Sequence, residues 1–340
     1  MGELWLERGD AKTRQLLWDA TYNEQGPWIA QELQASRLRF TLADKNTALP
    51  PLKVWGKAVR AISLTATATP ALAVLAWLWQ QEASINFTHA LLALLGVLFL
   101  QMAVNLLNDV SDYLKLIDLP GSLGGSGVIQ QGWRSAKQIR QGAYVCLGIG
   151  VLCGLPVVIL HPQLWLIAAT GTAGVLLYSA QHMGLKYRAL GDIAVWLLCG
   201  PVLTAGISYA ASGVCEADIL WIGGFFGFTS CAILHSNNLN DIEADSQRGA
   251  ITLAYLQGFT FARIWLVFYY VAAFCCLIPL VMQAPWITLV ALCLPLLIPV
   301  LIKLLRAASA DSPLLNQIRF ETAKLHLLSG ILLIAGILLS

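Results

Sequence analysis

The chain has 340 residues, of which 57% are hydrophobic and 12% charged, and its mean hydropathy is +0.68. Soluble globular chains carry about a quarter charged residues, so this composition excludes an ordinary soluble protein and indicates an integral membrane protein. The formal net charge is +2, and no basic stripe interleaved with aromatic residues occurs, so nucleic acid is not an expected partner. Most cysteines lie inside apolar runs without CxxC spacing, which indicates buried free thiols.

Residues 1–56 are polar throughout and hold seven acidic and seven basic side chains, so we expect a cytoplasmic arm distinct from the apolar remainder, residues 57–340. The arm contains no continuous apolar stretch of the kind that a cleaved secretion signal needs. Gly26-Pro27 is expected to end one short helix and begin another. The tryptophans of the arm favour an interfacial helix lying on the bilayer, with partner binding as the alternative.

Nine apolar segments follow the arm. A bilayer core needs about 20 mostly apolar residues of helix. The segments that approach this length are residues 61–81, 86–107, 141–160, 164–181, 191–211, 219–236, 261–282, 286–302 and 322–339. We therefore predict an all-α membrane protein, a bundle of nine transmembrane helices.

The basic residues predict the orientation of this bundle. All fourteen Lys and Arg beyond residue 56 precede the first segment or lie in or at the edges of the loops after the second, fourth, sixth and eighth. Because cytoplasmic loops are enriched in Lys and Arg, we expect the N-terminus in the cytoplasm and the C-terminus on the opposite side. The active site is then expected to face the cytoplasm, and the expected location is a bacterial cytoplasmic (inner) membrane.

Acidic side chains gather at the predicted cytoplasmic ends of the second and sixth segments. Carboxylates beside an apolar helix are costly and need a partner. In the first cluster, a rotation of about 100° per residue places two amides and two carboxylates on one helix face. These are Asn105, Asn108, Asp109 and Asp112, and Asp118 follows them.

The second cluster repeats this arrangement. One helix side carries Asn237, Asn240, Asp241, Asp245 and Arg248, whereas Glu243 points away from it. Taken singly, each of these acids could be a solvated or capping residue at a helix end. Two matching clusters on one side of the membrane favour a shared site.

Two carboxylate pairs without nearby His or Cys favour a hard cation, and Mg²⁺ is the expected cofactor. Mg²⁺ is commonly held by one or two carboxylates, several waters and substrate phosphates, so a diphosphate bridging two such ions would bring the pairs together. Lys115, Lys186, Arg188 and Arg248 lie close by in the sequence and are expected to neutralise the charge of a departing diphosphate. For Lys186 and Arg188, simple positive-inside retention is the alternative.

The two motifs resemble those of the UbiA superfamily of intramembrane aromatic prenyltransferases, which have nine spans and Asp-rich motifs after spans two and six. The resemblance runs from about residue 55 to the C-terminus. Asn108-Asp109-x-x-Asp112-Tyr113-x-Lys115 is similar to the branch that prenylates 1,4-dihydroxy-2-naphthoate in menaquinone synthesis. The loop at residues 124–132 and the stretch at residues 185–192 are also similar to this branch.

The resemblance implies a UbiA-like bundle that moves an isoprenyl chain from a polyprenyl diphosphate to an aromatic acceptor within the lipid bilayer. It assigns Mg²⁺-diphosphate binding to four carboxylates: Asp109, Asp112, Asp241 and Asp245. Lys115 and Tyr178 would join them near the reacting centre.

A surrounding set of substrate-binding side chains is also expected: Asn105, Asn108, Asp118, Lys186, Arg188, Asn237 and Arg248. The amides among them would position the carboxylates, and the basic residues would contact diphosphate or an acceptor carboxylate. Asp118 and Asp192 match the family pattern more weakly.

Other functions stay open at this point. Asn240 stands where relatives often have Arg, and Ala250-Ile251 stands where basic residues are usual, so a different donor or acceptor, or impaired catalysis, is compatible with the sequence. The acceptor could be 4-hydroxybenzoate or homogentisate. In a different class, a cation-coupled transporter would use intramembrane acids, but it would be expected to place them near the bilayer midplane.

Overall fold

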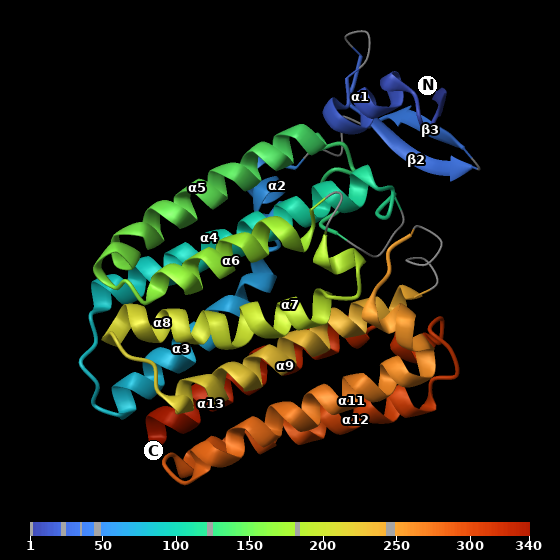
Figure 1. Ribbon diagram of the computed structural model, residues 1–340. Helices are drawn as coiled ribbons and strands as arrows, with labels where there is room; N and C mark the ends of the chain where they lie inside the picture. The colour runs from blue at the N-terminus through green and yellow to red at the C-terminus, as the bar shows by residue number, and fades with distance from the viewer. Residues whose placement is uncertain are drawn as a thin grey trace.

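A computed structural model of the chain describes residues 3–21, 25–34, 36–43, 49–120, 125–180, 184–242 and 249–340. Long helices lie side by side in a bundle, and a small sheet sits at one end of it (Figure 1). The C-terminus lies at the other end of the bundle.

The N-terminal part is a three-stranded antiparallel sheet with one helix. Its elements are β1 (Glu3–Glu7), α1 (Ala11–Asp19), β2 (Trp28–Gln34) and β3 (Arg37–Leu42), and the strand order is β1-β3-β2. The expectation of a helix after Gly26-Pro27 was wrong, because the strand β2 begins at Trp28. In β3, Leu38 and Phe40 are fully buried between more exposed neighbours, a period of two that suits a strand.

This sheet packs directly on the membrane bundle. Trp28 and Phe40 share one hydrophobic core with Leu106 and Ile139, which belong to the long helices α4 and α5. The sheet therefore rests on the same end of α4 that carries the first acidic segment.

The bundle begins with α2 (Pro51–Ala58), a short helix whose Val54 and Ala58 are buried while Leu52 is 86% exposed. The helices and turns that follow are η2 (Ala61–Leu64), α3 (Thr65–Gln80), α4 (Phe87–Leu114), α5 (Ala136–Leu160), α6 (Leu164–Tyr178), η3 (Leu185–Tyr187), α7 (Gly191–Leu197), η4 (Leu198–Val202), α8 (Leu203–Ser212), α9 (Ala217–Asn240), α11 (Leu253–Val281), η5 (Pro285–Cys293), α12 (Leu294–Arg306), η6 (Pro313–Leu315) and α13 (Ile318–Leu339).

Within the described residues, eight helical stretches are long and apolar enough to cross a membrane. The fourth predicted segment forms α6, which has 15 residues and falls short of that length. All nine predicted segments are thus largely helical, while the structure supports eight of them as spans by length and composition. The chain is a multi-pass membrane protein.

Glycines bring several of these helices close together. A Cβ added at Gly150 of α5 would lie 3.0 Å from the carbonyl oxygen of Gly96 in α4. A Cβ added at Gly200 in η4 would lie 2.5 Å from the carbonyl oxygen of Gly223 in α9. Small residues at such crossings allow the close backbone approach on which membrane helix packing depends.

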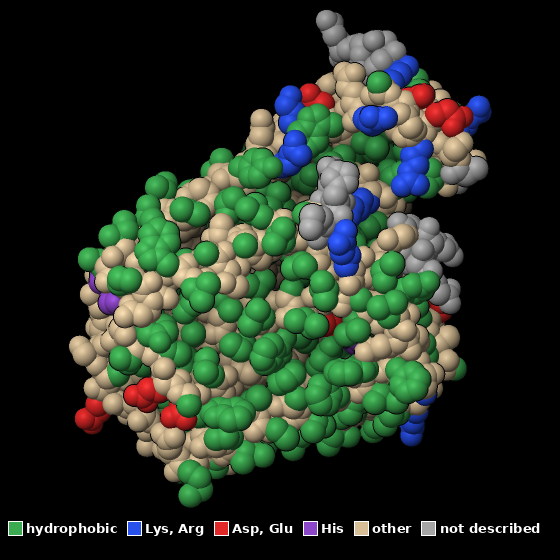
Figure 2. Space-filling model, viewed as in Figure 1, with side chains coloured by type: hydrophobic (Ala, Val, Ile, Leu, Met, Phe, Trp, Pro, Cys, Tyr) green, Lys and Arg blue, Asp and Glu red, His purple; other side chains and the backbone are tan. Residues whose placement is uncertain are grey.

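The surface shows a lipid-facing flank and a charged end. Hydrophobic side chains cover most of the flank, and Lys and Arg gather at the end that carries the N-terminal sheet (Figure 2). Leu152, Leu166 and Phe261 are each more than 60% exposed. An apolar surface of this extent needs a nonaqueous neighbour, as the sides of a membrane bundle have.

Candidate active site

A cavity of about 680 Å³ lies among α4, α5, α6, α8 and α9. Its volume is in the range of sites for small molecules and cofactors. Apolar side chains and glycines form most of its wall. Its polar lining consists mainly of Arg60, Asn105, Asn108, Asp112, Asp118, Tyr178, Lys186, Asn237, Asn238, Asp241 and Arg319. Both acidic segments therefore contribute to a single cavity.

Asp112 of this wall accepts hydrogen bonds from three side chains. It lies in the last turn of α4 and is 2% exposed. Lys186 donates to Oδ2 at 2.7 Å, Tyr187 donates to Oδ1 at 2.7 Å, and Asn108 donates to Oδ2 at 2.9 Å. The spacing of Asn108 and Asp112 allows this contact, because residues four apart are neighbours on a helix surface.

Lys186 reaches the carboxylate from the loop between α6 and α7. Its Nζ also donates to Asn108 Oδ1 at 3.1 Å. Burial alone would lower the pKa of Lys186, but the charge and hydrogen bond of Asp112, together with Tyr178 and Asp118, outweigh it and hold the pKa above its ordinary value. An ammonium group therefore stands fixed at the polar end of the cavity.

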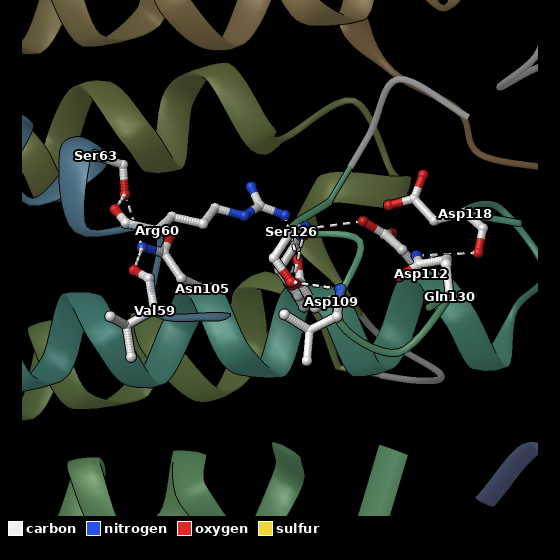
Figure 3. A network of polar contacts seen from close by, with 12 residues as sticks. Val59, Arg60, Ser63, Asn105, Asp109, Asp112, Asp118, Ser126 and Gln130 are labelled. Carbon is white, nitrogen blue, oxygen red and sulfur yellow. Dashed lines mark hydrogen bonds and ion pairs between the residues drawn. The ribbon is translucent and has the colours of Figure 1, made fainter. Parts of the chain in front are cut away.

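Asp109 is turned toward a different partner. It forms an ion pair with Arg60, the residue just before η2, and accepts a hydrogen bond from the backbone N–H of Ser126 at 3.1 Å (Figure 3). Asn105 lies one turn earlier on α4 and donates to the carbonyl oxygen of Val59 at 3.0 Å. The first acidic segment thus fastens both the entry to α3 and the loop before α5.

Asp118 lines this side of the cavity, and Lys115 lies nearby against Tyr187. Asp118 is 5% exposed, and burial, reinforced by the charge of Asp112, raises its pKa to about 6. Gly125 lines the cavity beside it, and a Cβ at Gly125 would lie 2.7 Å from Oδ2 of Asp118. Lys115 Nζ lies 3.2 Å from the ring centroid of Tyr187, a cation–π contact.

The second segment begins where α9 ends. Asn237 and Asp241 line the cavity, and Asp241 caps the helix by donating its backbone N–H to the carbonyl oxygen of Asn237 at 3.1 Å. Asn240 instead donates to the carbonyl oxygen of Leu315 at 3.3 Å. Asp245, Glu243 and Arg248 lie outside the described residues.

Several sequence candidates are not part of the cavity wall: Asp109, Lys115, Arg188 and Asp192. Arg188 is exposed, and its backbone pairs with Ile251. Asp192 is 3% exposed and is held within the bundle by His235 at 2.6 Å and Tyr269 at 2.8 Å.

Sequence reasoning missed several polar residues of the site. Arg60 and Arg319 were treated only as markers of membrane orientation, and Asn238 and Tyr187 received no role. A signal for Arg60 was available, because it is the basic residue directly before the first apolar segment. Nothing local identifies Arg319, since tertiary packing alone brings the start of α13 to this cavity.

The donor set suits a hard divalent cation. Asp112, Asp118 and Asp241 offer carboxylate oxygens at one end of the cavity, and asparagine amides flank them. Among the described residues, no three His, Cys, Asp or Glu side chains form a complete metal cluster. This pattern fits Mg²⁺, which takes few protein carboxylates and completes its shell with water and phosphate.

Comparisons with known proteins show the family of the chain. The UbiA prenyltransferase family model matches residues 67–328. The chain belongs to the UbiA prenyltransferase family. The "UbiA prenyltransferase domain-containing protein 1" of Gallus gallus is 30% identical over 288 residues, which cover 83% of this chain and 84% of that protein.

A bacterial relative and two solved structures add detail. The 1,4-dihydroxy-2-naphthoate octaprenyltransferase of Mycobacterium tuberculosis is 32% identical over 171 residues, covering 48% of this chain and 56% of that protein. A UbiA homolog from Archaeoglobus fulgidus bound to GPP and Mg²⁺ has a TM-score of 0.56 at 16% identity, covering 83% of this chain and 99% of that one. A digeranylgeranylglyceryl phosphate synthase reaches 0.60 at 18% identity, with coverages of 85% and 99%.

Proposed function

We propose that this chain transfers an isoprenyl group from a polyprenyl diphosphate to an aromatic quinone precursor, 1,4-dihydroxy-2-naphthoate. One observation carries the proposal: a single cavity joins a charged end, with both acidic segments, to a long apolar wall. A polyprenyl diphosphate has the same two parts. The family membership supports the reaction class, and the donor proposed here is of the class bound by the Archaeoglobus fulgidus homolog.

The charged end would hold the diphosphate and Mg²⁺. Asp109, Asp112, Asp241 and Asp245 would hold the metal, and Asp118 would lie beside the substrate. When bound, Mg²⁺ supplies positive charge that stabilises the departing diphosphate. Lys186 stands ready to neutralise the same oxygens, because Asp112 and Asn108 already fix its ammonium group.

The apolar wall would protect the reaction. The bond between the allylic carbon and the diphosphate oxygen breaks, and a ring carbon of the acceptor forms the new bond to that allylic carbon. For a naphthoate acceptor, the attacked ring carbon loses a proton, and the ring carbon that carried the carboxylate loses CO₂ and takes up a proton. The products are then demethylmenaquinol, CO₂ and diphosphate. Water would intercept the allylic cation, so a wall of leucine, valine and glycine favours transfer over hydrolysis.

Similarity to naphthoate prenyltransferases supports 1,4-dihydroxy-2-naphthoate as the acceptor. The naphthoate octaprenyltransferases of Mycobacterium tuberculosis and Haemophilus influenzae are similar over about half of this chain. Vertebrate UbiA domain proteins are similar over more of it. Lipid quinones of cells with and without this chain, measured by mass spectrometry, test the assignment. An unchanged level of demethylmenaquinone would redirect the search to 4-hydroxybenzoate or homogentisate.

The proposed membrane arrangement has nine crossings, with α6 as the short fourth one. The N-terminus and the charged end of the cavity would face the cytoplasm, since Lys and Arg gather there. A bacterial cytoplasmic membrane is part of this proposal. Cysteine labelling of Leu52→Cys and Ser340→Cys in sealed vesicles would place the two ends of the chain.

Removal of divalent metal is expected to stop the reaction. In proteoliposomes, EDTA should lower prenyl transfer at least about a hundredfold, and excess Mg²⁺ should restore it, because metal charge contributes several kcal/mol at such sites. Ion flux is measured in the same proteoliposomes, because a cation-coupled transporter is the alternative function. Transfer that persists without divalent metal would contradict the metal-assisted mechanism, and coupled flux without product would favour a transporter.

Tyr187 is expected to position the carboxylate of Asp112. Tyr187→Phe removes the hydroxyl that donates to Asp112 but keeps the ring beneath Lys115. A hydrogen bond to a charged group contributes about 1.5–3 kcal/mol, so kcat/KM should fall roughly tenfold or more. Tyr113→Phe is the matched control, because that hydroxyl accepts from Ala30 in the N-terminal sheet. Equal activity of the two variants would show that the Tyr187 contact has no role in transfer.

A further inference from the structure

Two glycines of the apolar wall differ from the other glycines that line the cavity. A Cβ added at Gly154 of α5 or at Gly171 of α6 would meet no heavy atom within 4 Å. By contrast, an added Cβ would lie 3.0 Å from its nearest neighbour at Gly150 and 2.5 Å at Gly174, both of which also line the cavity. At Gly150 and Gly174 the glycine allows helix packing. At Gly154 and Gly171 it leaves open space in the cavity.

The two glycines lie at different distances from the charged end. Gly171 is seven residues before Tyr178 on α6, which corresponds to about 10 Å along the helix axis. Gly154 lies beside Gly96, because a Cβ at Gly96 would be 3.6 Å from the backbone nitrogen of Gly154. Gly96 is twelve residues before Asn108 on α4, about 18 Å along that axis. Gly154 is therefore the deeper of the two positions.

We propose that Gly154 and Gly171 determine the length of isoprenyl chain that the cavity accepts, an inference that rests on the proposed function. A chain entering from the charged end passes Gly171 first and reaches Gly154 only when it is longer. Each missing side chain leaves room for part of the isoprenoid tail. A leucine at either position would project into that room and end the cavity at that depth, since packed apolar interiors do not yield to added volume without cost.

The test is a binding series that needs neither turnover nor an acceptor. Full-length protein in nanodiscs is titrated with unreactive prenyl thiolodiphosphates of two, four and eight isoprene units. Gly154→Leu should weaken the eight-unit analogue at least about tenfold and leave the two-unit analogue within about threefold of wild type. Gly171→Leu should shift this limit to shorter chains, so that the four-unit analogue is also weakened.

Gly148→Leu is the matched control. Gly148 lies on α5, is exposed, and also has nothing within 4 Å of an added Cβ, but it lies outside the cavity wall. Its variant should bind all three analogues as wild type does. If Gly154→Leu and Gly171→Leu keep the wild-type preference, or if both weaken all lengths equally while Gly148→Leu does not, the inference is wrong.

Folding and function are separated by two further measurements. Gly154→Ala and Gly171→Ala add one methyl group, and their melting temperatures in detergent show whether the helices pack normally. These alanine variants should show the same order of length preference, with smaller shifts. Wild-type protein that binds the analogues in a length-dependent way but transfers no prenyl group would contradict the proposed function and leave the length inference standing.

Discussion

Asp112→Asn is expected to lower kcat/KM for prenyl transfer at least about a thousandfold, equivalent to roughly 4 kcal/mol of lost transition-state stabilisation. Asparagine keeps the shape of the side chain and can still accept from Tyr187. It removes the negative charge that fixes Lys186 and that would hold Mg²⁺. Metal-assisted departure of a diphosphate depends on that charge, so the chemical step should suffer more than substrate binding.

Asp241→Asn should have a comparable effect, because Asp241 brings the second acidic segment to the same cavity. Asp109→Ala is also expected to abolish transfer, by releasing Arg60 and the loop at Ser126. The rates are measured in proteoliposomes at saturating Mg²⁺, with insertion checked by protease protection.

The matched control for these variants is Asp218→Asn. Asp218 lies in the first turn of α9, where its carboxylate accepts from Gln283 at 3.0 Å. This variant should transfer at the wild-type rate. Near-normal turnover in Asp112→Asn, at any Mg²⁺ concentration, would remove Asp112 from the metal site and leave its contacts with Lys186 a structural role.

The membrane helices follow closely from the sequence because the bilayer imposes a single strong requirement on composition and length. Apolar segments of about the right length and the Pro and Gly residues between them set most helix boundaries. The apolar run does not predict where α9 ends, because the helix continues to Asn240, several residues beyond the last apolar residue of the predicted segment. The number of membrane spans is harder to predict than the apolar segments themselves. Composition identifies the fourth segment, but its helix, α6, has only 15 residues.

The N-terminal sheet could not be predicted in the same way. In β1, Glu3 pairs with Thr41, almost forty residues away, so the strand is stabilised by a distant partner. Strand propensity depends on such cross-strand neighbours more than on the local sequence. The period of two in β3 was the available signal, and the arm was instead expected to form short helices on either side of Gly26-Pro27.

Some features of the candidate site could likewise be predicted from the local sequence, and others depend on tertiary packing. Helical periodicity groups Asn105, Asn108 and Asp112, and the structure has all three in the cavity wall. Periodicity does not show that Asp109 turns to Arg60, because that depends on where the chain enters α3. Likewise, Arg319 and Asp241 both line the cavity because helices that are far apart in the sequence pack around it.

Asp192→Ala is expected to destabilise the protein by about 3–5 kcal/mol, the usual effect of removing one partner from a buried charged network. Asp192 Oδ2 lies 2.6 Å from Nδ1 of His235 and accepts from Tyr269 at 2.8 Å. Nε2 of His235 lies 2.9 Å from the carbonyl oxygen of Ala262, which can only accept. Nε2 therefore donates to that carbonyl oxygen, and without the carboxylate Nδ1 of this fully buried ring loses its hydrogen-bond partner.

Thermal unfolding in detergent measures this effect, and the melting temperature should fall by roughly 10 °C. Asp192→Asn and Tyr269→Phe, which each leave part of the network intact, should lose less. Below its melting temperature, the folded fraction of Asp192→Ala should bind prenyl thiolodiphosphates as wild type does, because the network joins α7, α9 and α11 and lies outside the cavity wall. A variant with unchanged melting temperature and lost transfer would instead place Asp192 in the reaction, since stability would then not account for the loss.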